Sequence, residues 1–417
     1  MKILPRIKKK EPRVPHYVSL DIGTEFVKAL IFRIDEGRGI IVGTGRQRQR
    51  LGDMHGGTVT DIAGVVENCS KALDKAEEMA GVVADQCIIG IAGELVKGTT
   101  TTVHYERLNS TKKIDLAELK NIVNKVQWKA YDAAREQLAW ETGQEELDVK
   151  LVSASIVDVK IDGYKVTNPV GFQGKDVSIG IFNAFAPMVH LGALQTIAAD
   201  LGLELVSIAA EPYAVARSVG VDEAGEFSAI FIDIGGGTSD IAVVRNGGLE
   251  GTKMFAIGGR SFTKRVSQSF NVPFAKAEEI KITYATDGLE EDDADKVRDA
   301  LELDAEVWLS GVELSLSEFS DVDSLPSRIL LCGGGSALPE IKKALESKDW
   351  YKDLPFAKKP KVSFIKPEDV ANMVDDSDTI KDQQDITPMG LASLLVDMDI
   401  EDEVMPSILQ KIVRSMQ

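Results

Sequence analysis

The sequence predicts an α/β protein with two related lobes, because two segments far apart in the chain share one pattern. An apolar segment runs into Leu20-Asp21-Ile22-Gly23-Thr24, and another runs into Ile232-Asp233-Ile234-Gly235-Gly236-Gly237-Thr238. Further apolar segments follow these turns at 26–34 and 240–245. We name residues 17–34 the first hairpin and residues 228–245 the second hairpin. One such hairpin is commonplace, but two with the same Asp-Ile-Gly core favour a repeated functional unit.

The turns of both hairpins suit a bound phosphate. Glycine lets backbone amides approach an anion with no Cβ in the way, and successive amides form an anion-binding concavity. Asp21 and Asp233 end the preceding strands with hard oxygen ligands, which suit Mg²⁺ and its water molecules. Two such hairpins facing each other would hold a nucleoside triphosphate between the lobes. The phosphate-binding residues that this hypothesis names are Asp21, Gly23, Thr24, Asp233, Gly235, Gly236, Gly237 and Thr238.

A third glycine cluster predicts a surface for a base and a ribose. The apolar segment 328–332 runs into Gly333-Gly334-Gly335, and Pro339 marks the first turn of a following helix. A strand, a glycine turn and a helix N-terminus expose bare backbone against which a nucleoside can lie. Between the second and third clusters, Glu278 and Lys281 are three residues apart and share a helical face. Taken alone, that pair is typical of a surface salt bridge.

The remaining elements divide the chain into a first lobe, an insert and a second lobe. In the first lobe, a β-meander leads to a helix with Ala63, Val66, Ala72, Leu73 and Ala76 on its apolar side. The insert has one or two strands at 86–108, a helix at 116–140 and three strands at 150–185. Apolar residues at spacings of three and four make that helix amphipathic, namely Leu119, Ile122, Val123, Val126 and Ala130.

The domain boundaries follow from these elements. The acidic run 290–293 in the second lobe is interpreted as a solvated loop. We expect a basic tail at 1–14, a first core lobe at 15–86 that continues at 188–225 and 386–398, an inserted strand-helix-strands domain at 87–187, a second core lobe at 226–259 that continues at 327–385, a small subdomain at 260–326, and a C-terminal segment at 399–417.

The C-terminal segment predicts an amphipathic helix after an acidic linker. One half of its helical wheel is apolar, and the other half carries two cations. Such a helix is typical of a segment lying in a membrane interface, although an ordinary helix packed on the body is the alternative. The residues predicted to contact lipid are Ile408, Leu409, Ile412, Val413, Met416, Lys411 and Arg414.

Composition excludes several classes of protein. The net charge of −18 disfavours nucleic-acid binding, which needs a positive surface. The three cysteines, Cys69, Cys87 and Cys332, lie far apart without metal-ligand spacing, which indicates a reduced cytosolic protein with neither structural disulfides nor a zinc site. The sequence has neither a spanning apolar run nor a signal peptide.

The order of these motifs resembles the actin, Hsp70 and sugar-kinase superfamily of ATP-binding folds. Glu211-Pro212 lies between the two hairpins, and Gly258-Gly259 lies between the second hairpin and the Glu278–Lys281 pair. Within the superfamily the chain is most similar to FtsA, the bacterial actin homologue of cell division. The resemblance runs from about Tyr17 to Leu395 and includes Asn168-Pro169-Val170-Gly171. It implies a two-lobed actin-like ATPase fold, a duplicated ribonuclease H-like core with an inserted domain of the SHS2 type in the first lobe.

The resemblance also implies roles for residues of the site. ATP and Mg²⁺ are the expected cofactors, with Asp21 and Asp233 holding the metal through water. Gly258 and Gly259 would belong to the nucleotide site, Gly333, Gly334 and Gly335 would back the adenosine, and Glu278 and Lys281 would reach the base or ribose. Glu211 would orient the attacking water in a slow hydrolysis. Its alternative role is a first-turn carboxylate favoured by the helix dipole.

The function implied by the resemblance is that of an ATP-binding filament protein at the cytoplasmic face of the bacterial membrane. It would polymerise there, anchor the division protein FtsZ at the division site and recruit later division proteins. An adaptor of type IV pilus assembly resembling PilM is an alternative with the same fold and insert. A small-molecule kinase is a second alternative, but no motif for a substrate-side base is present.

Overall fold

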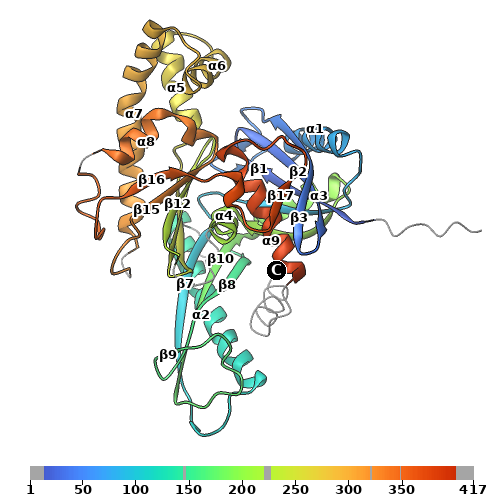
Figure 1. Cartoon of the computed structure of the whole chain (residues 1–417), viewed down its shortest axis with the longest axis vertical. Helices are drawn as coiled ribbons and strands as arrows, with labels where there is room; N and C mark the ends of the chain where they lie inside the picture. Colours follow the sequence, from blue (N-terminus) through green and yellow to red (C-terminus); the bar gives the residue numbers. More distant parts are fainter. Residues whose placement is uncertain (1–13, 144–146, 220–226, 320–321, 348, 401–417) are drawn as a thin grey trace, which may run out of the picture.

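Two sheets with the same core order form the two lobes in the computed structural model, which describes residues 14–143, 147–219, 227–319, 322–347 and 349–400 (Figure 1). The first sheet has, in spatial order, β11 (Glu204–Ala210), β6 (Gln86–Ile91), β1 (His16–Ile22), β2 (Phe26–Asp35), β3 (Arg38–Arg48) and β17 (Met373–Asp375). The second has β16 (Lys361–Phe364), β15 (Arg328–Cys332), β12 (Ala229–Ile234), β13 (Ser239–Arg245), β14 (Gly248–Phe255), β7 (Lys97–Glu106), β10 (Asp176–Pro187), β8 (Val149–Ile161) and β9 (Tyr164–Lys165).

The predicted duplication of the core is confirmed by strand topology. In the first lobe β1, β2 and β3 are antiparallel neighbours, and β6 and β11 extend the sheet in parallel from β1. In the second lobe β12, β13 and β14 repeat the antiparallel part, while β15 and β16 repeat the parallel part. The two hairpins therefore occupy equivalent places in the two lobes.

Helices cover the first sheet at close range. The helix α1 (Ile62–Ala80) packs on β2 and β3, where glycines allow the approach: a Cβ at Gly45 would lie 1.8 Å from the carbonyl oxygen of Ala72. The helix α9 (Ile386–Ile400) packs on β1 and on α4 (Glu211–Ser218). The helix α3 (Met188–Asp200) connects β10 to β11, and β4 (Met54–His55) pairs with β5 (Thr58–Val59).

A helical subdomain projects from the second lobe, at the top of Figure 1. It consists of α5 (Gly259–Phe270), α6 (Phe274–Ala285) and α7 (Glu291–Ser317), and Trp308 lies fully buried in its core. The interpretation of residues 290–293 as a loop is wrong, because Glu291, Asp292 and Asp293 form the first turn of α7. Carboxylates are favourable there because the helix N-terminus carries partial positive charge.

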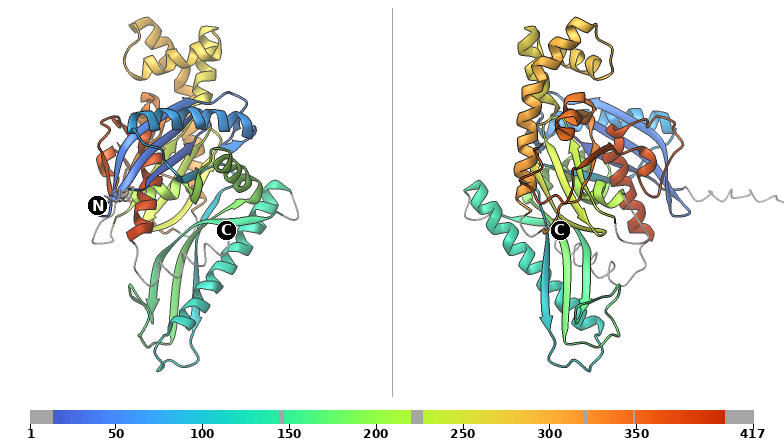
Figure 2. Two further views of the ribbon diagram at one scale, coloured as in Figure 1. Left: turned by 90° about the vertical axis from the view of Figure 1, so that its right-hand side faces the viewer. Right: turned by 60° about the vertical axis from the view of Figure 1, so that its left-hand side comes forward.

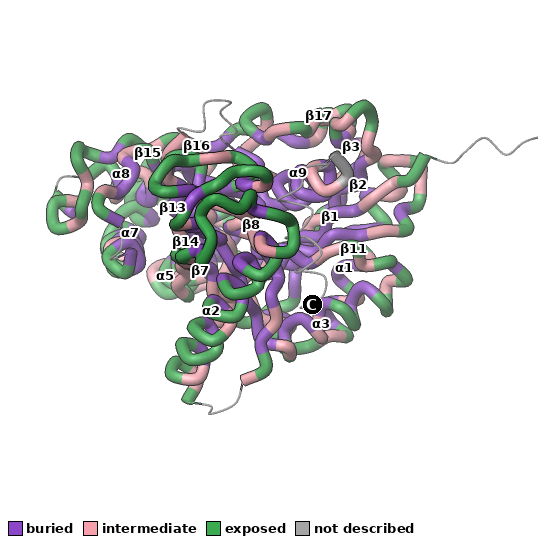
Figure 3. The backbone as a smooth tube through the Cα atoms, turned by 90° about the horizontal axis from the view of Figure 1, so that it is seen from below, coloured by how far each residue is buried: buried purple, intermediate pink, exposed green. Residues whose placement is uncertain are grey.

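The insert is an elongated extension below the lobes (Figure 2). Its helix α2 (Leu116–Thr142) packs on the strands through Leu119, Ile122, Val123 and Val126, all of them predicted, and its other side is exposed (Figure 3). The predicted start at residue 87 is corrected, because β6 pairs with both β1 and β11 inside the first sheet. Its residues 87–91 are all buried, as expected of a parallel strand covered on both faces. The insert proper therefore begins with β7.

The placement of the insert within the first lobe is also corrected. The strand β7 pairs with β14 through Gly251 and Thr99 and through Thr252 and Gly98, so the insert continues the sheet of the second lobe. No local sequence signal marks this two-residue ladder. The insert therefore leaves and rejoins the chain at first-lobe elements but is hydrogen-bonded to the second lobe.

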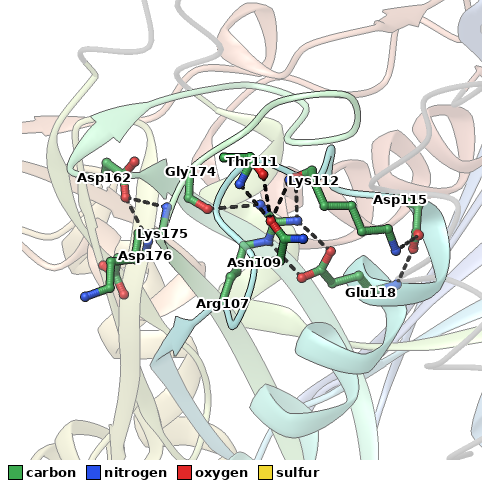
Figure 4. Close-up of polar contacts among 10 residues, drawn as sticks. All are labelled: Arg107, Asn109, Thr111, Lys112, Asp115, Glu118, Asp162, Gly174, Lys175 and Asp176. Atoms are coloured by element: carbon green, nitrogen blue, oxygen red, sulfur yellow. Dashed lines mark hydrogen bonds and ion pairs between the residues drawn. The ribbon is translucent and has the colours of Figure 1, made fainter.

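A buried arginine fixes the loops at the end of the insert far from β14. Arg107 is 4% exposed and makes an ion pair of 2.8 Å with Glu118 of α2. Its guanidinium also donates to the carbonyl oxygens of Gly174, at 2.9 Å, and Lys112, at 2.8 Å (Figure 4). The Arg107 side chain thus holds the segments 107–115 and 163–174 against each other and against α2.

Short helical turns and α8 (Pro339–Glu346) complete the described chain. The 3₁₀ turns are η1 (Gly334–Ala337), η2 (Pro367–Asp369) and η3 (Gln383–Asp385). The helix α9 extends to Ile400, two residues into the segment predicted as an acidic linker. Residues 1–13 of the predicted basic tail and all residues predicted to contact lipid lie outside the described residues.

Candidate functional site

A cavity of about 420 Å³ lies where the two hairpins and the third glycine cluster meet. Most residues predicted for nucleotide binding contribute to its wall: Asp21, Gly23, Thr24, Asp233, Gly235, Gly236, Thr238, Gly259, Glu278, Lys281, Gly333, Gly334 and Gly335. Glu211 lines the cavity as well. Gly237 and Gly258 do not line it. The structure thus brings together segments that are more than 300 residues apart.

Three of the glycines lie in close contact with their neighbours around the cavity. A Cβ at Gly258 would lie 2.7 Å from the carbonyl oxygen of Gly235, and one at Gly237 would lie 3.0 Å from Thr24 of the facing hairpin. Gly333 has φ +81°, and a Cβ there would lie 2.1 Å from Oδ1 of Asp233. The third cluster therefore packs directly against the second hairpin, and the two hairpin turns touch each other.

Four carboxylates dominate the electrostatics of the cavity. Burial, together with the charges of Asp21, Asp240 and Asp233, raises the pKa of Glu211 well above its usual range. Burial and the neighbouring Asp233 raise the pKa of Asp240 to about 8. Burial also raises the pKa of Asp233, although a hydrogen bond donated by the Thr387 hydroxyl opposes this shift. Without a bound cation, the cavity disfavours ionisation of Glu211, Asp233 and Asp240.

One lysine partly compensates this negative charge. Nζ of Lys28 lies 2.9 Å from Oδ2 of Asp21 and donates to the carbonyl oxygen of Gln384 at 2.7 Å. Burial alone would lower the pKa of Lys28, but the carboxylates of Asp21, Asp385 and Asp233 together raise it. Lys28 is therefore charged at neutral pH.

The Glu278–Lys281 pair is not a surface salt bridge, because the two residues are only 6% and 8% exposed. Nζ of Lys281 lies 2.9 Å from Glu278 and donates to the carbonyl oxygen of Gly259 at 3.0 Å and to the hydroxyl of Thr263 at 2.8 Å. The pair therefore ties α6 to the start of α5 beside the cavity.

Sequence reasoning missed several residues of the cavity, and for two of them a signal exists. Asp21 stands opposite Lys28 in the first hairpin, and Asp233 stands opposite Asp240 in the second. Both partners follow their aspartate by seven residues, so aligning the two hairpins identifies Lys28 and Asp240 as equivalent positions. Other missed residues include Glu25, Arg260 and Thr387, for which tertiary contacts are the only signal.

Asp21 and Asp233 fit a magnesium ion that keeps its water molecules. Within the described ranges, no three His, Cys, Asp or Glu side chains are arranged to hold a metal directly. The cavity nevertheless holds a buried excess of carboxylates over cations, which a divalent ion would offset, and Mg²⁺ binds proteins through few carboxylates and several waters.

Also among the described residues, no helix is both long enough and apolar enough to cross a membrane.

Comparison with known proteins agrees with this geometry. The family described as "Cell division protein FtsA" matches residues 230–382. The cell division protein FtsA of Neisseria meningitidis is 31% identical over 283 residues, which are 66% of this chain and 64% of that protein. FtsA of Pseudomonas aeruginosa is 27% identical over 270 residues, 64% of this chain and 60% of that protein. The matched parts are therefore less than two thirds of these relatives' length. FtsA of Bacillus subtilis is 23% identical over 344 residues, 78% of this chain and 74% of that protein.

Among solved structures, the chain is similar to one described as "PilM-PilN type IV pilus biogenesis complex", with a TM-score of 0.65 and 18% identity over 92% of this chain and 99% of the other. At that identity, the likeness concerns the fold alone.

The duplicated core and the cavity between its hairpins define an actin-like ATPase fold. The chain is a relative of the FtsA cell division proteins, so the resemblance indicated by its motifs is confirmed. The relatives that match are named as cell division proteins.

Proposed function

We propose that the chain binds Mg²⁺ and ATP in the cavity between the hairpins. The observation that carries this proposal is the convergence of both Asp-Ile-Gly turns and the third glycine cluster on one cavity. The turns offer backbone amides to the phosphates, and Gly333 to Gly335 offer bare backbone to the nucleoside. When bound, the metal supplies positive charge that offsets the carboxylates.

The carboxylates take different parts in this proposal. Asp21 and Asp233 would hold the metal through its water molecules. Glu211 begins α4 and lines the cavity, where its carboxylate, once ionised, would orient the attacking water towards the terminal phosphate. Glu211 is close to the backbone of β6, since a Cβ at Gly90 would lie 2.5 Å from its Oε1.

Calorimetry of MgATP binding tests the nucleotide site. We expect Asp233→Ala to bind MgATP at least about tenfold more weakly than the wild type, because a charge-assisted contact contributes about 1.5–3 kcal/mol. Circular dichroism must show that the variant is folded. Wild-type affinity in a folded Asp233→Ala protein would show that the site is assigned wrongly.

We further propose that the chain polymerises at the cytoplasmic face of the bacterial membrane, anchors FtsZ there and recruits later division proteins. Its similarity to FtsA supports this role, and the amphipathic pattern of residues 404–416 supports membrane attachment. Pelleting with anionic liposomes, with and without MgATP, for the full chain and a truncation after Asp399 tests the attachment. ATP-independent pelleting of both proteins would contradict it.

The same experiment separates this role from that of a pilus-assembly adaptor. An adaptor of that kind needs no lipid-binding helix, so the full chain would stay in the supernatant.

A separate assay of ATP consumption tests the small-molecule kinase, which would consume ATP in the presence of a phosphate acceptor.

A further inference from the structure

Glu25, at the turn of the first hairpin, holds an arginine from each lobe. Its Oε1 accepts from Nε of Arg48 on β3 at 2.7 Å, and its Oε2 accepts from Nε of Arg260 on α5 at 2.6 Å. Nη2 of Arg260 also donates to the carbonyl oxygen of Thr24 at 2.6 Å. The Glu25 side chain is 10% exposed and that of Arg260 is 17% exposed. The ion pair between Glu25 and Arg260 therefore joins the lobes and is largely shielded from water.

This ion pair lies where the two hairpin turns touch. The backbone N–H of Arg260 donates to the carbonyl oxygen of Gly236 at 2.7 Å, and a Cβ at Gly236 would lie 2.5 Å from the Cβ of Glu25. Glu25 and Arg260 both line the cavity, whereas Arg48 does not. Of the two arginines that Glu25 binds, only Arg260 can thus also meet a ligand in the cavity.

The carboxylate of Glu25 occupies the position that an anion between these turns would take. Guanidinium groups bind carboxylate and phosphate oxygens through the same paired N–H geometry. A phosphate group that enters between the turns meets Arg260 already desolvated and aimed at an oxygen, but must displace the Glu25 carboxylate, which also repels it.

We infer that Glu25 is an internal substitute for the terminal phosphate of a triphosphate, and that Arg260 exchanges from Glu25 to that phosphate on binding. The inference rests on the proposed nucleotide site and adds a specificity-determining pair to it. A triphosphate reaches the hairpin turns and gains Arg260, while a diphosphate leaves Arg260 on Glu25. The pair then distinguishes ATP from ADP and releases one contact between the lobes only when ATP is bound.

The ratio of ATP affinity to ADP affinity measures this exchange. Glu25→Gln removes the competing charge, so the ratio rises by about tenfold if a charge-assisted hydrogen bond is redirected. Arg260→Ala lowers the ratio towards one, and Arg260→Lys restores part of it. In the Arg260→Ala background, Glu25→Gln no longer raises the ratio. Arg48→Ala is the matched control, because Arg48 also binds Glu25 but does not line the cavity, and it leaves the ratio unchanged.

Tripolyphosphate and pyrophosphate, which lack the nucleoside, separate this inference from the proposed ATP site. Each variant is checked by circular dichroism for folding before titration. An unchanged ratio in Glu25→Gln, or equal losses of ATP and ADP affinity in folded Arg260→Ala, overturns the exchange and leaves the ATP site standing. Binding of tripolyphosphate that depends on Arg260, without binding of either nucleotide, overturns the ATP site and supports the exchange. Absence of binding for all four probes overturns both.

Discussion

At the scale of single residues, the cavity is defined by an imbalance of charge. Asp21, Glu211, Asp233 and Asp240 all line it, and Lys28 forms an ion pair with Asp21. Burial disfavours the ionised forms of Glu211, Asp233 and Asp240, and each ionised neighbour adds to that cost. The same imbalance creates affinity for a cation, which lowers the pKa values that burial raises.

The stability of the free protein should therefore depend on pH through Asp240. Its pKa is about 8 in the fold and 3.8 as its ordinary value, so the folded state binds more protons than the unfolded state between these pH values. The free energy of unfolding thus falls as pH rises through this window, by at most about 1.4 kcal/mol per unit from this group. We expect Asp240→Asn to flatten this dependence and to be more stable than the wild type at pH 8, as measured by urea denaturation without Mg²⁺. A variant less stable than the wild type at pH 8 would argue that ionised Asp240 is stabilised in the fold.

Hydrolysis provides the test for Glu211. Glu211→Ala should retain MgATP, because it removes positioning of water without removing the phosphate-binding turns, and should lose the slow phosphate release of the wild type. Phosphate release in single turnover, with binding measured separately, checks both parts. Equal release by the two proteins would leave Glu211 only its role at the start of α4.

At the scale of elements, local patterns predicted the hairpins and the third glycine cluster, because strand, turn and helix start are all written in neighbouring residues. Pairing between distant strands was not predictable in this way. The sequence of β6 contains no signal that it pairs with β1 and β11. For this reason the predicted start of the insert, at residue 87, lies before its observed start at β7. The face of α1 was also predicted incompletely: Ala63 is exposed, whereas Asn68 is buried, where it donates to Gln49 at 2.7 Å and Asp53 at 2.8 Å.

The same limits apply to the site. Glycines and aspartates of the turns could be named from the sequence, because their conformational and chemical roles are local. Arg260 could not be named, since its contact with Glu25 spans 235 residues. Burial of the Glu278–Lys281 pair was likewise invisible in the sequence, where its spacing is that of any exposed helical pair.

Two deletions of the insert should behave differently. Lys97 and Phe185 are cross-strand partners, so removing residues 97–187 leaves ends that a short glycine linker can join. We expect this protein to fold and bind nucleotide but to form no filaments, if the insert supplies the contact between subunits. Removing residues 87–187 also deletes most of β6 from the first sheet, and that protein should not fold. Circular dichroism and electron microscopy check these outcomes. ATP-dependent filaments of the shorter deletion would show that the insert is not part of the contact.

At the scale of the whole molecule, the proposed membrane attachment would depend on many weak contacts acting together. Burial of the apolar residues predicted to contact lipid contributes about 25 cal/mol per Å², and Lys411 and Arg414 add about 1 kcal/mol each on anionic lipid. The acidic residues before the predicted helix would oppose these gains, because anionic lipid repels them. A filament presents many such segments side by side, so its avidity exceeds the affinity of one chain.

Ile412→Glu tests this attachment, because it places a charge in the centre of the apolar arc. The variant should lose co-sedimentation with anionic liposomes while its MgATP affinity stays that of the wild type. Ser407→Glu, on the polar half of the predicted helix, is the matched control for added charge and should lose less binding. Undiminished co-sedimentation of Ile412→Glu would move the membrane role to the basic residues 1–14 or remove it.

With the short ladder between β7 and β14, the insert is connected to both lobes. Its peptide bonds tie it to β6 and α3 of the first lobe, while Gly98 and Thr99 tie it to the second. If the lobes rotate about each other, the insert must either follow one of them or lose these two residue pairs. An insert that follows one lobe would act as a lever, so a small movement at the hairpins would become a larger displacement at the loops around Arg107.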